Sequence, residues 1–245
     1  MRLDQLLVER DLYPSREKAR RAIMAGEVQV NGQRVDKAGT AVADDADIEV
    51  AAREPYVSRA GRKLEGALDH FNLDPKDFVC ADIGASTGGF TDCLLQRGAR
   101  KVFAVDVGYG QLDMRLRNDS RVVVMERLNA RHLAPDAFSG ERCDLITVDV
   151  SFISLVKVVP ALLTHLAENG RLLPLIKPQF EAGRHQVGKG GIVRDENVRQ
   201  QVIRQRIEDL SALGLECLGS LDSPLAGMGG NREALALFQA VESKS

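Results

Sequence analysis

Two charged side chains stand at equivalent points in the second half of the chain. Asp149 follows the apolar run 145–148, and Lys177 follows the largely apolar run 171–176. In open α/β sheets ligands bind beyond the carboxyl ends of the strands, so we expect both side chains to face one crevice. The pair could be a structural ion pair. Buried charge at this edge is costly, however, and is usually functional, which favours an active site.

A glycine-rich turn precedes both residues. Residues 81–91 read Ala-Asp-Ile-Gly-Ala-Ser-Thr-Gly-Gly-Phe-Thr, an apolar run that breaks into glycines before an amphipathic stretch. This pattern predicts a strand that leads into a helix, where glycines admit a close ligand and free N–H groups lie beside it. The spacing Gly84-x-x-x-Gly88-Gly89 fits neither the dinucleotide pattern Gly-x-Gly-x-x-Gly nor a P-loop. Together with the later carboxylates and lysines, the turn predicts a nucleotide-like ligand.

Further polar residues lie where a nucleoside could be held. Asp106 ends a strand pattern roughly 20 residues beyond the turn, where an acid can accept hydrogen bonds from both ribose hydroxyls of an adenosine cofactor. Asp82 could either support the loop or contact the ligand. Glu126 and Asn129, on the next strand–loop unit, could face the adenine.

The elements that position these side chains begin at residue 58, where helical and strand patterns alternate as in a doubly wound parallel α/β sheet. Helices are expected at 155–167 and 196–213. Residues 215–221 and 234–241 are expected to pair as antiparallel strands that close the sheet. The buried strand candidates are Val79–Ile83, Lys101–Val105, Val122–Met125, 145–148 and 171–176.

The loop 178–193 follows the last of these strand candidates at the same edge of the sheet. It contains four glycines together with Arg184, His185 and Lys189. It could be a solvated connection between elements, or a lid or RNA-contacting loop beside the crevice.

Residues 1–50 form a separate small α+β pattern. Ser15 can cap a helix that Gly26 ends, and Asn31-Gly32 between two alternating stretches predicts a β-hairpin. Basic residues crowd the helix and its approach, while acids gather at 44–49. The segregation predicts one basic face able to bind nucleic-acid phosphates, although a merely solvated helix surface is the alternative. These basic residues are Arg10, Arg16, Lys18, Arg20 and Arg21.

Length and composition bound the remaining possibilities. The 245 residues can hold one large domain and a small one, and residues 51–57, with helix-disfavouring Pro55, are the expected linker. The net charge of −2 gives no global positive field.

The four cysteines are scattered, and none lies at metal-ligand spacing with a histidine, so no metal is expected. No stretch approaches the ~18 apolar residues of a membrane span, and no signal core is visible, so we expect a cytoplasmic protein without a membrane partner.

Both parts of the chain resemble known families. Residues 58–241 resemble the FtsJ-type S-adenosylmethionine-dependent ribose 2′-O-methyltransferases. The full length is similar to the TlyA family of ribosomal RNA cytidine 2′-O-methyltransferases, often labelled hemolysin A, which the stretches Lys-Pro-Gln-Phe-Glu and Lys-Gly-Gly-Ile-Val fit. The family's Lys-Asp-Lys-Glu tetrad matches Lys63, Asp149, Lys177 and Glu233. The small unit resembles the S4 RNA-binding domain at Arg2-Leu3-Asp4, Ser15-Arg16, Ala19, Ile23, Gly26, Val28, Val30 and Asn31-Gly32.

The resemblance implies a Rossmann-like class I methyltransferase domain at 58–245 behind an S4-like domain at 1–50. It implies S-adenosyl-L-methionine as the donor and ribosomal RNA within ribosomal subunits as the substrate. The donor is expected to contact Asp82, Gly84, Ser86, Thr87, Gly88, Gly89, Phe90, Asp106, Glu126 and Asn129. RNA is expected to contact Arg2, Arg16, Lys18, Arg20, Arg21, Arg59, Arg62, Arg184 and Lys189.

The implied chemistry assigns a role to each member of the tetrad. A ribose 2′-hydroxyl is a poor nucleophile while protonated, so the enzyme must align the reacting atoms and ease loss of the proton. Lys177 is expected to activate the hydroxyl, because a lysine amine loses its proton more readily when desolvated or near another cation such as Lys63. Asp149 would orient the two lysines, and Glu233 would hold a lysine or the ribose.

Three other functions are considered. A methyltransferase acting on a small molecule is disfavoured by the basic N-terminal unit. A noncatalytic RNA-binding or ribosome-assembly factor is disfavoured by the intact tetrad. A membrane-lytic hemolysin is disfavoured because the sequence has neither a membrane span nor a long basic amphipathic helix.

Overall fold

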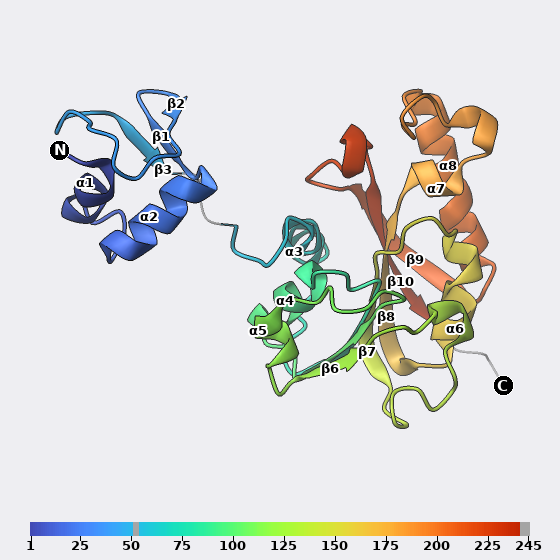
Figure 1. Ribbon diagram of the computed structural model, residues 1–245. Helices are drawn as coiled ribbons and strands as arrows, with labels where there is room; N and C mark the ends of the chain where they lie inside the picture. The colour runs from blue at the N-terminus through green and yellow to red at the C-terminus, as the bar shows by residue number, and fades with distance from the viewer. Residues whose placement is uncertain (51–53, 241–245) are drawn as a thin grey trace. The chain divides into compact units, whose positions relative to one another are not determined.

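The computed structural model describes residues 1–50 and 54–240 (Figure 1). The chain divides into two compact units, Met1–Glu54 and Pro55–Ser245. Of the expected linker at 51–57, residues 51–53 lie outside the described residues.

The small unit packs two helices against a three-stranded sheet of order β2-β1-β3. The Ser15 hydroxyl accepts a hydrogen bond from the Lys18 N–H, and Gly26 ends the helix in the left-handed conformation, as predicted. Asn31 (φ 50°) and Gly32 (φ 74°) connect the hairpin with two positive φ angles, as a two-residue turn of type I′ requires. The elements are α1 (Leu3–Glu9), α2 (Arg16–Ala25), β1 (Val28–Val30), β2 (Gln33–Arg34) and β3 (Ile48–Val50).

The large unit contains a seven-stranded sheet of order β6-β5-β4-β7-β8-β10-β9. From β6 to β8 neighbouring strands are parallel, and β10 runs antiparallel to both β8 and β9. This confirms the predicted doubly wound sheet with a closing antiparallel pair. The strands are β4 (Val79–Ile83), β5 (Lys101–Val105), β6 (Val122–Met125), β7 (Cys143–Val148), β8 (Leu166–Ile176), β9 (Leu215–Asp222) and β10 (Ala234–Ala240).

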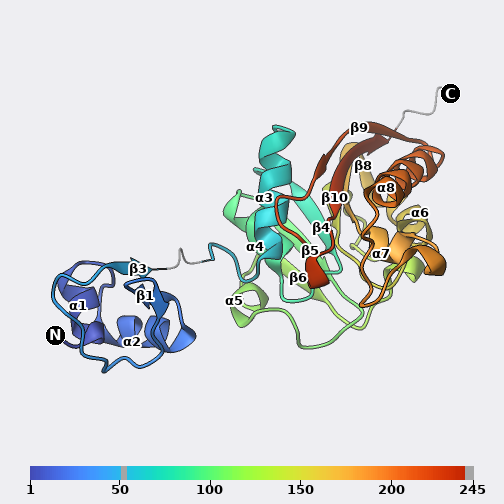
Figure 2. The ribbon, with the colours of Figure 1, turned by 90° about the horizontal axis from the view of Figure 1, so that it is seen from above.

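Helices cover both faces of this sheet (Figures 1 and 2). One face carries α3 (Ala60–His70), α4 (Gly89–Gln96) and α5 (Met114–Arg117), and the other carries α6 (Val159–Leu163) and α8 (Glu196–Ser211). Two apolar cores result, because alternate residues of each strand point to opposite faces. The short remaining helices are η1 (Ala130–His132), η2 (Leu155–Lys157), α7 (Pro178–Glu181), η3 (Arg184–Gln186) and η4 (Met228–Gly230).

The continuous helix predicted at 155–167 is wrong. The structure has η2 and then α6, and the strand β8 already begins at Leu166. Pro160 lies in the first turn of α6, where its missing N–H costs nothing, so it starts a new helix. The Cys143 N–H then donates to the His165 carbonyl, which ties the following residues to β7. An apolar run of this kind suits either a helix or a buried strand, and tertiary pairing decides between them.

Candidate active site

Two adjoining cavities lie at the carboxyl ends of β4 and β7. The chain winds from β4 toward β5 and from β7 toward β8, so this is the point where the sheet order reverses and ligands bind. The larger cavity has a volume of about 440 Å³ and the smaller about 220 Å³. Both are lined by Gly84, Ser86, Asp149 and Ser151.

The glycine turn forms one wall of these cavities. Gly84 has φ 87°, and a Cβ there would lie 2.4 Å from the Asp149 carbonyl oxygen. Gly88 has φ 97°, and a Cβ there would lie 2.2 Å from Leu116 Cδ1. Gly88 lines neither cavity. The protein's own packing therefore excludes a larger side chain at both positions, whether or not a ligand is bound. Thr87, Gly89 and Phe90 line the smaller cavity.

Asp82 is fully buried between the turn and the sheet. Its Oδ2 accepts hydrogen bonds from the N–H and the hydroxyl of Thr91, at 2.9 and 2.7 Å, and its Oδ1 accepts one from the Thr147 hydroxyl at 3.3 Å. Burial raises the pKa of Asp82 to about 7 despite these donors, and the nearby charge of Asp149 contributes to this rise. Asp82 therefore holds the start of α4 to the end of β4, and it also borders the smaller cavity.

The raised pKa of Asp82 predicts a pH dependence of stability. Between the unfolded pKa of 3.8 and the folded value of about 7, the folded state binds more protons than the unfolded state. The free energy of unfolding should therefore fall as pH rises through this range, by at most about 1.4 kcal/mol per pH unit. Asp82→Asn should remove this component while still accepting from Thr91. Urea unfolding of both proteins across the range would measure it, and parallel pH curves would contradict it.

Asp106 and Asn129 border the larger cavity, whereas Glu126 borders neither. The Asp106 carboxylate accepts hydrogen bonds from the Ser86 N–H at 2.8 Å and the Gly108 N–H at 2.6 Å, which fix it beside the turn. The Asn129 side chain accepts a hydrogen bond from the Arg131 N–H at 3.1 Å and so caps the start of η1.

Glu126, which was expected to face the adenine, is held elsewhere. Its carboxylate pairs with Arg117 and accepts a hydrogen bond from the Gly110 N–H at 2.9 Å. The bond with Arg117 lowers the pKa of Glu126. The carboxylate therefore supports the loop between β5 and α5.

The four residues of the tetrad form two ion pairs. Lys177 Nζ lies 2.6 Å from Asp149 Oδ1, and both residues line the smaller cavity. Lys63 Nζ lies 2.6 Å from Glu233 Oε2, and both side chains are buried outside the cavity linings. Ala234 of β10 pairs with Ile176 of β8, so the antiparallel register places Glu233 opposite Lys177.

Two residues at this site were missed by sequence reasoning. The Ser151 hydroxyl accepts a hydrogen bond from Lys177 Nζ at 3.0 Å, and the Gln179 amide donates to Glu233 Oε1 at 3.3 Å. Each is a polar residue two positions after a predicted site residue at a strand end, and that proximity was the available signal.

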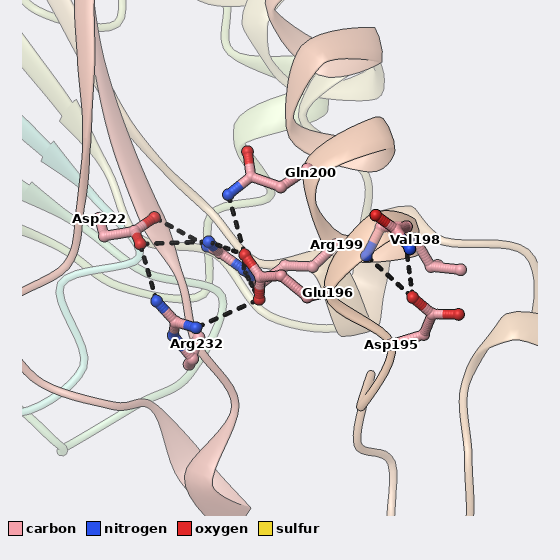
Figure 3. A network of polar contacts seen from close by, with 8 residues as sticks. Asp195, Glu196, Val198, Arg199, Gln200, Asp222 and Arg232 are labelled. Atoms are coloured by element: carbon pink, nitrogen blue, oxygen red, sulfur yellow. Dashed lines mark hydrogen bonds and ion pairs between the residues drawn. The ribbon is translucent and has the colours of Figure 1, made fainter.

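A charged network fixes the chain immediately before Glu233 (Figure 3). The buried Arg199 guanidinium bonds to both Glu196 and Asp222, and Arg232 pairs with the same two acids at 3.2 and 3.0 Å. The bond with Arg199 lowers the pKa of Glu196 to about 2. The network therefore ties the start of β10 to α8 and to the end of β9.

Asn231 connects the same point to the glycine-rich loop. Its Oδ1 accepts from the Val193 N–H at 3.1 Å, and its Nδ2 donates to the Gly191 carbonyl at 2.9 Å. In this loop Lys189 is exposed, and the side chain of Arg184 lies outside what the structure describes. At the start of α3, Arg59 is exposed and Arg62 is half-buried.

The small unit carries a basic groove of about 490 Å³ along α2. Arg2 and Arg16 both bond to the buried carboxylate of Asp4, at 3.0 and 3.1 Å, and the bond with Arg2 lowers the pKa of that carboxyl. Arg20 and Arg21 also line the groove.

Three basic residues of the small unit are engaged differently. Lys18 is exposed and does not line the groove. Arg21 lines the groove but forms an ion pair with Glu17 at 2.6 Å. Arg10 donates to the carbonyls of Asp44 and Ala46, so it lies with the acidic segment.

The described part of the chain comprises residues 1–50 and 54–240. Within these ranges, no group of three or more His, Cys, Asp or Glu side chains is placed to hold a metal ion. No helix in the same ranges is long and apolar enough to cross a bilayer.

Comparison with known proteins agrees with this geometry. Residues 56–240 match the family model of the FtsJ-like methyltransferases, and residues 1–48 match that of the S4 domain. The "Putative rRNA methyltransferase YqxC" of Bacillus subtilis (strain 168) is 51% identical over 96% of this chain and 84% of that protein. The 16S/23S rRNA (cytidine-2′-O)-methyltransferase TlyA of Mycobacterium tuberculosis is 47% identical over 95% of this chain and 87% of that protein.

A solved structure extends the similarity to three dimensions. The "Putative hemolysin from Streptococcus thermophilus" is 43% identical, with a TM-score of 0.78 over 99% of this chain and 89% of that one. The chain therefore belongs to the FtsJ-like methyltransferases, in the TlyA family that carries an S4 domain ahead of the methyltransferase domain.

Proposed function

We propose that the protein transfers a methyl group from S-adenosyl-L-methionine to the 2′-hydroxyl of a cytidine ribose in ribosomal RNA within ribosomal subunits, in the cytoplasm. The observation that carries this proposal is the Lys177–Asp149 pair in the cavity beside the glycine turn. The membership of the chain in the TlyA family supports the choice of ribose and of ribosomal RNA.

The residues around the two cavities suit this donor. The larger cavity offers the Asp106 carboxylate for ribose hydroxyls and the apolar side chains of Leu128 and Ile153 for an adenine ring. The smaller cavity, bordered by Thr87 and Phe90, would hold the methionine portion. When bound, the donor supplies a sulfonium methyl group that is already electrophilic. The protein must then align the ribose oxygen and manage its proton.

Lys177 is the group that would accept the proton of the ribose hydroxyl. Lys177 Nζ donates a hydrogen bond to the Ser151 hydroxyl and forms an ion pair with Asp149 at 2.6 Å. An amine nitrogen has three positions besides its bond to carbon, and one of those that remain would face the ribose hydroxyl. In this mechanism Asp149 and Ser151 orient the amine, while Lys63 and Glu233 act from behind the cavity wall.

Methylation of purified ribosomal subunits with labelled donor, followed by nucleotide mapping, tests the function. We expect label on a 2′-oxygen of ribosomal RNA. Binding to subunits without transfer would favour a noncatalytic assembly factor. Label confined to small molecules would contradict an RNA substrate.

Asp106→Ala is expected to weaken donor binding by about 1–3 kcal/mol, the range for a buried polar group that loses its partner. The substitution removes the carboxylate proposed to bind the ribose, and it also frees the Ser86 and Gly108 N–H groups. Titration calorimetry with the donor measures the change. Glu126→Gln is the comparison variant, since Glu126 borders neither cavity, and equal losses in both variants would count against the assignment of Asp106.

The S4 domain at 1–50, joined through 51–57, is proposed to supply RNA affinity through the groove on α2. Arg20→Ala should weaken subunit binding and reduce the salt dependence of its binding constant by about one phosphate contact. Arg16 is left intact in this test because it helps neutralise the buried Asp4. Lys37→Ala, at an exposed lysine of the same unit, is the control. If the salt slopes of the three proteins agree, the groove does not bind RNA phosphates.

A further inference from the structure

We propose that Glu181 is a positioning residue for methyl transfer, which holds the segment 149–154 in the shape that presents Asp149 and Ser151 to Lys177. The proposal rests on the proposed function. Glu181 borders neither cavity and its side chain is only 2% exposed, so it can act only through other residues.

The Glu181 carboxylate binds the far end of this segment. Its Oε1 accepts a hydrogen bond from the Leu155 N–H at 2.8 Å, and its Oε2 accepts one from the Ser154 hydroxyl at 2.5 Å. Ser154 occupies the N-cap position of η2, yet its own side chain makes no capping bond. Glu181 therefore caps η2 from a different part of the chain.

Lys177 binds the near end of the same segment. Its Nζ contacts Asp149 at 2.6 Å and Ser151 at 3.0 Å. Lys177 and Glu181 are the two ends of the turn that contains α7 (Pro178–Glu181). One short element thus binds the loop after β7 at both of its ends.

The loop between these two points needs such support. Phe152 has φ 63°, a conformation that residues with side chains rarely adopt, and the residue is 86% exposed. Val150 and Ile153 pack partly against the core, and the centroid of the Phe152 ring lies 4.8 Å from that of Phe180 in α7. Together with these contacts, the attachments at the two ends of the loop fix where Asp149 and Ser151 lie.

Arg206 completes the arrangement from α8. Its guanidinium donates to the Ser154 hydroxyl at 3.2 Å and lies 3.5 Å from Glu181 Oε2, while its other end pairs with Asp209 at 2.7 Å. Burial raises the pKa of the Glu181 carboxyl, whereas its hydrogen-bond donors and the charge of Arg206 lower it. These donors and Arg206 stabilise the ionised carboxylate that binds the loop.

The test is single-turnover methylation of ribosomal subunits at saturating donor, with binding of donor and subunits measured separately. Glu181→Ala should reduce the transfer rate at saturating donor by about 10- to 100-fold, the scale for a small misplacement of reacting groups, while the dissociation constant for the subunits changes by less than about twofold. Glu181→Gln retains an acceptor for the Leu155 N–H and should restore the rate to within about threefold of wild type.

Asp144→Ala is the matched control. Asp144 Oδ2 accepts a hydrogen bond from the Val79 N–H at 2.8 Å, so the substitution removes a comparable contact at the opposite end of β7. The transfer rate of this variant should match that of wild type. The proposal is overturned if Glu181→Ala transfers at the wild-type rate, or if Asp144→Ala loses as much activity. Should Glu181→Ala not fold, Ser154→Ala decides: a slower rate at saturating donor with unchanged subunit binding supports the proposal, and a wild-type rate overturns it. Absence of transfer by the wild-type protein would instead refute the proposed function.

Discussion

Lys177→Ala is expected to slow methyl transfer by roughly 100-fold or more, the usual effect of removing a positioned acid–base group. The substitution removes the amine that Asp149 and Ser151 hold at the cavity. The protein should still fold and bind RNA, because the lost group lies at a cavity wall and not within an apolar core. Single-turnover methylation of the ribosomal substrate is the measurement, since it is independent of slow product release.

Lys157→Ala provides the control for this experiment, because Lys157 is an exposed lysine on the neighbouring η2. Transfer by Lys177→Ala at a near-native rate would remove Lys177 from the mechanism. Loss of folding would support the alternative of a structural ion pair. If Lys63→Ala remains folded but abolishes transfer, and Lys177→Ala does not, the roles of the two lysines were assigned in the wrong order.

Removing one member of the Lys63–Glu233 pair is expected to lower the free energy of unfolding by about 3–5 kcal/mol, because the remaining charge is then buried without its partner. The side chains are 11% and 2% exposed, and they lie 2.6 Å apart. The double variant Lys63→Met with Glu233→Gln should recover most of this loss. Urea unfolding of the two single variants and the double variant measures the coupling.

Lys101→Met tests whether burial is the cause of this effect. Lys101 also forms an ion pair, with Glu141, but each side chain is 33% exposed. Loss of this pair should cost no more than about 1 kcal/mol. Equal costs at the two sites would show that burial does not determine the penalty.

Much of the fold of both units was predictable because its signals are local. The glycine turn, the apolar runs of β4 to β6 and the hairpin at Asn31-Gly32 each depend on a few neighbouring residues. The positions of Asp106, Asp149 and Lys177 at one edge followed from the rule that parallel strands end together. For these three residues the sequence alone determined the edge of the sheet at which they lie.

The partners of those side chains were determined only by the tertiary structure. Lys63 and Glu233 are 170 positions apart and meet because β10 inserts antiparallel beside β8. Glu126 has a suitable position in the sequence, yet Arg117 holds it away from the cavities. Such contacts depend on loop paths and strand register, and these result from many weak interactions between distant segments. Local patterns specify a strand and where it ends, whereas only the packed chain specifies which side chains lie next to the residue at that end.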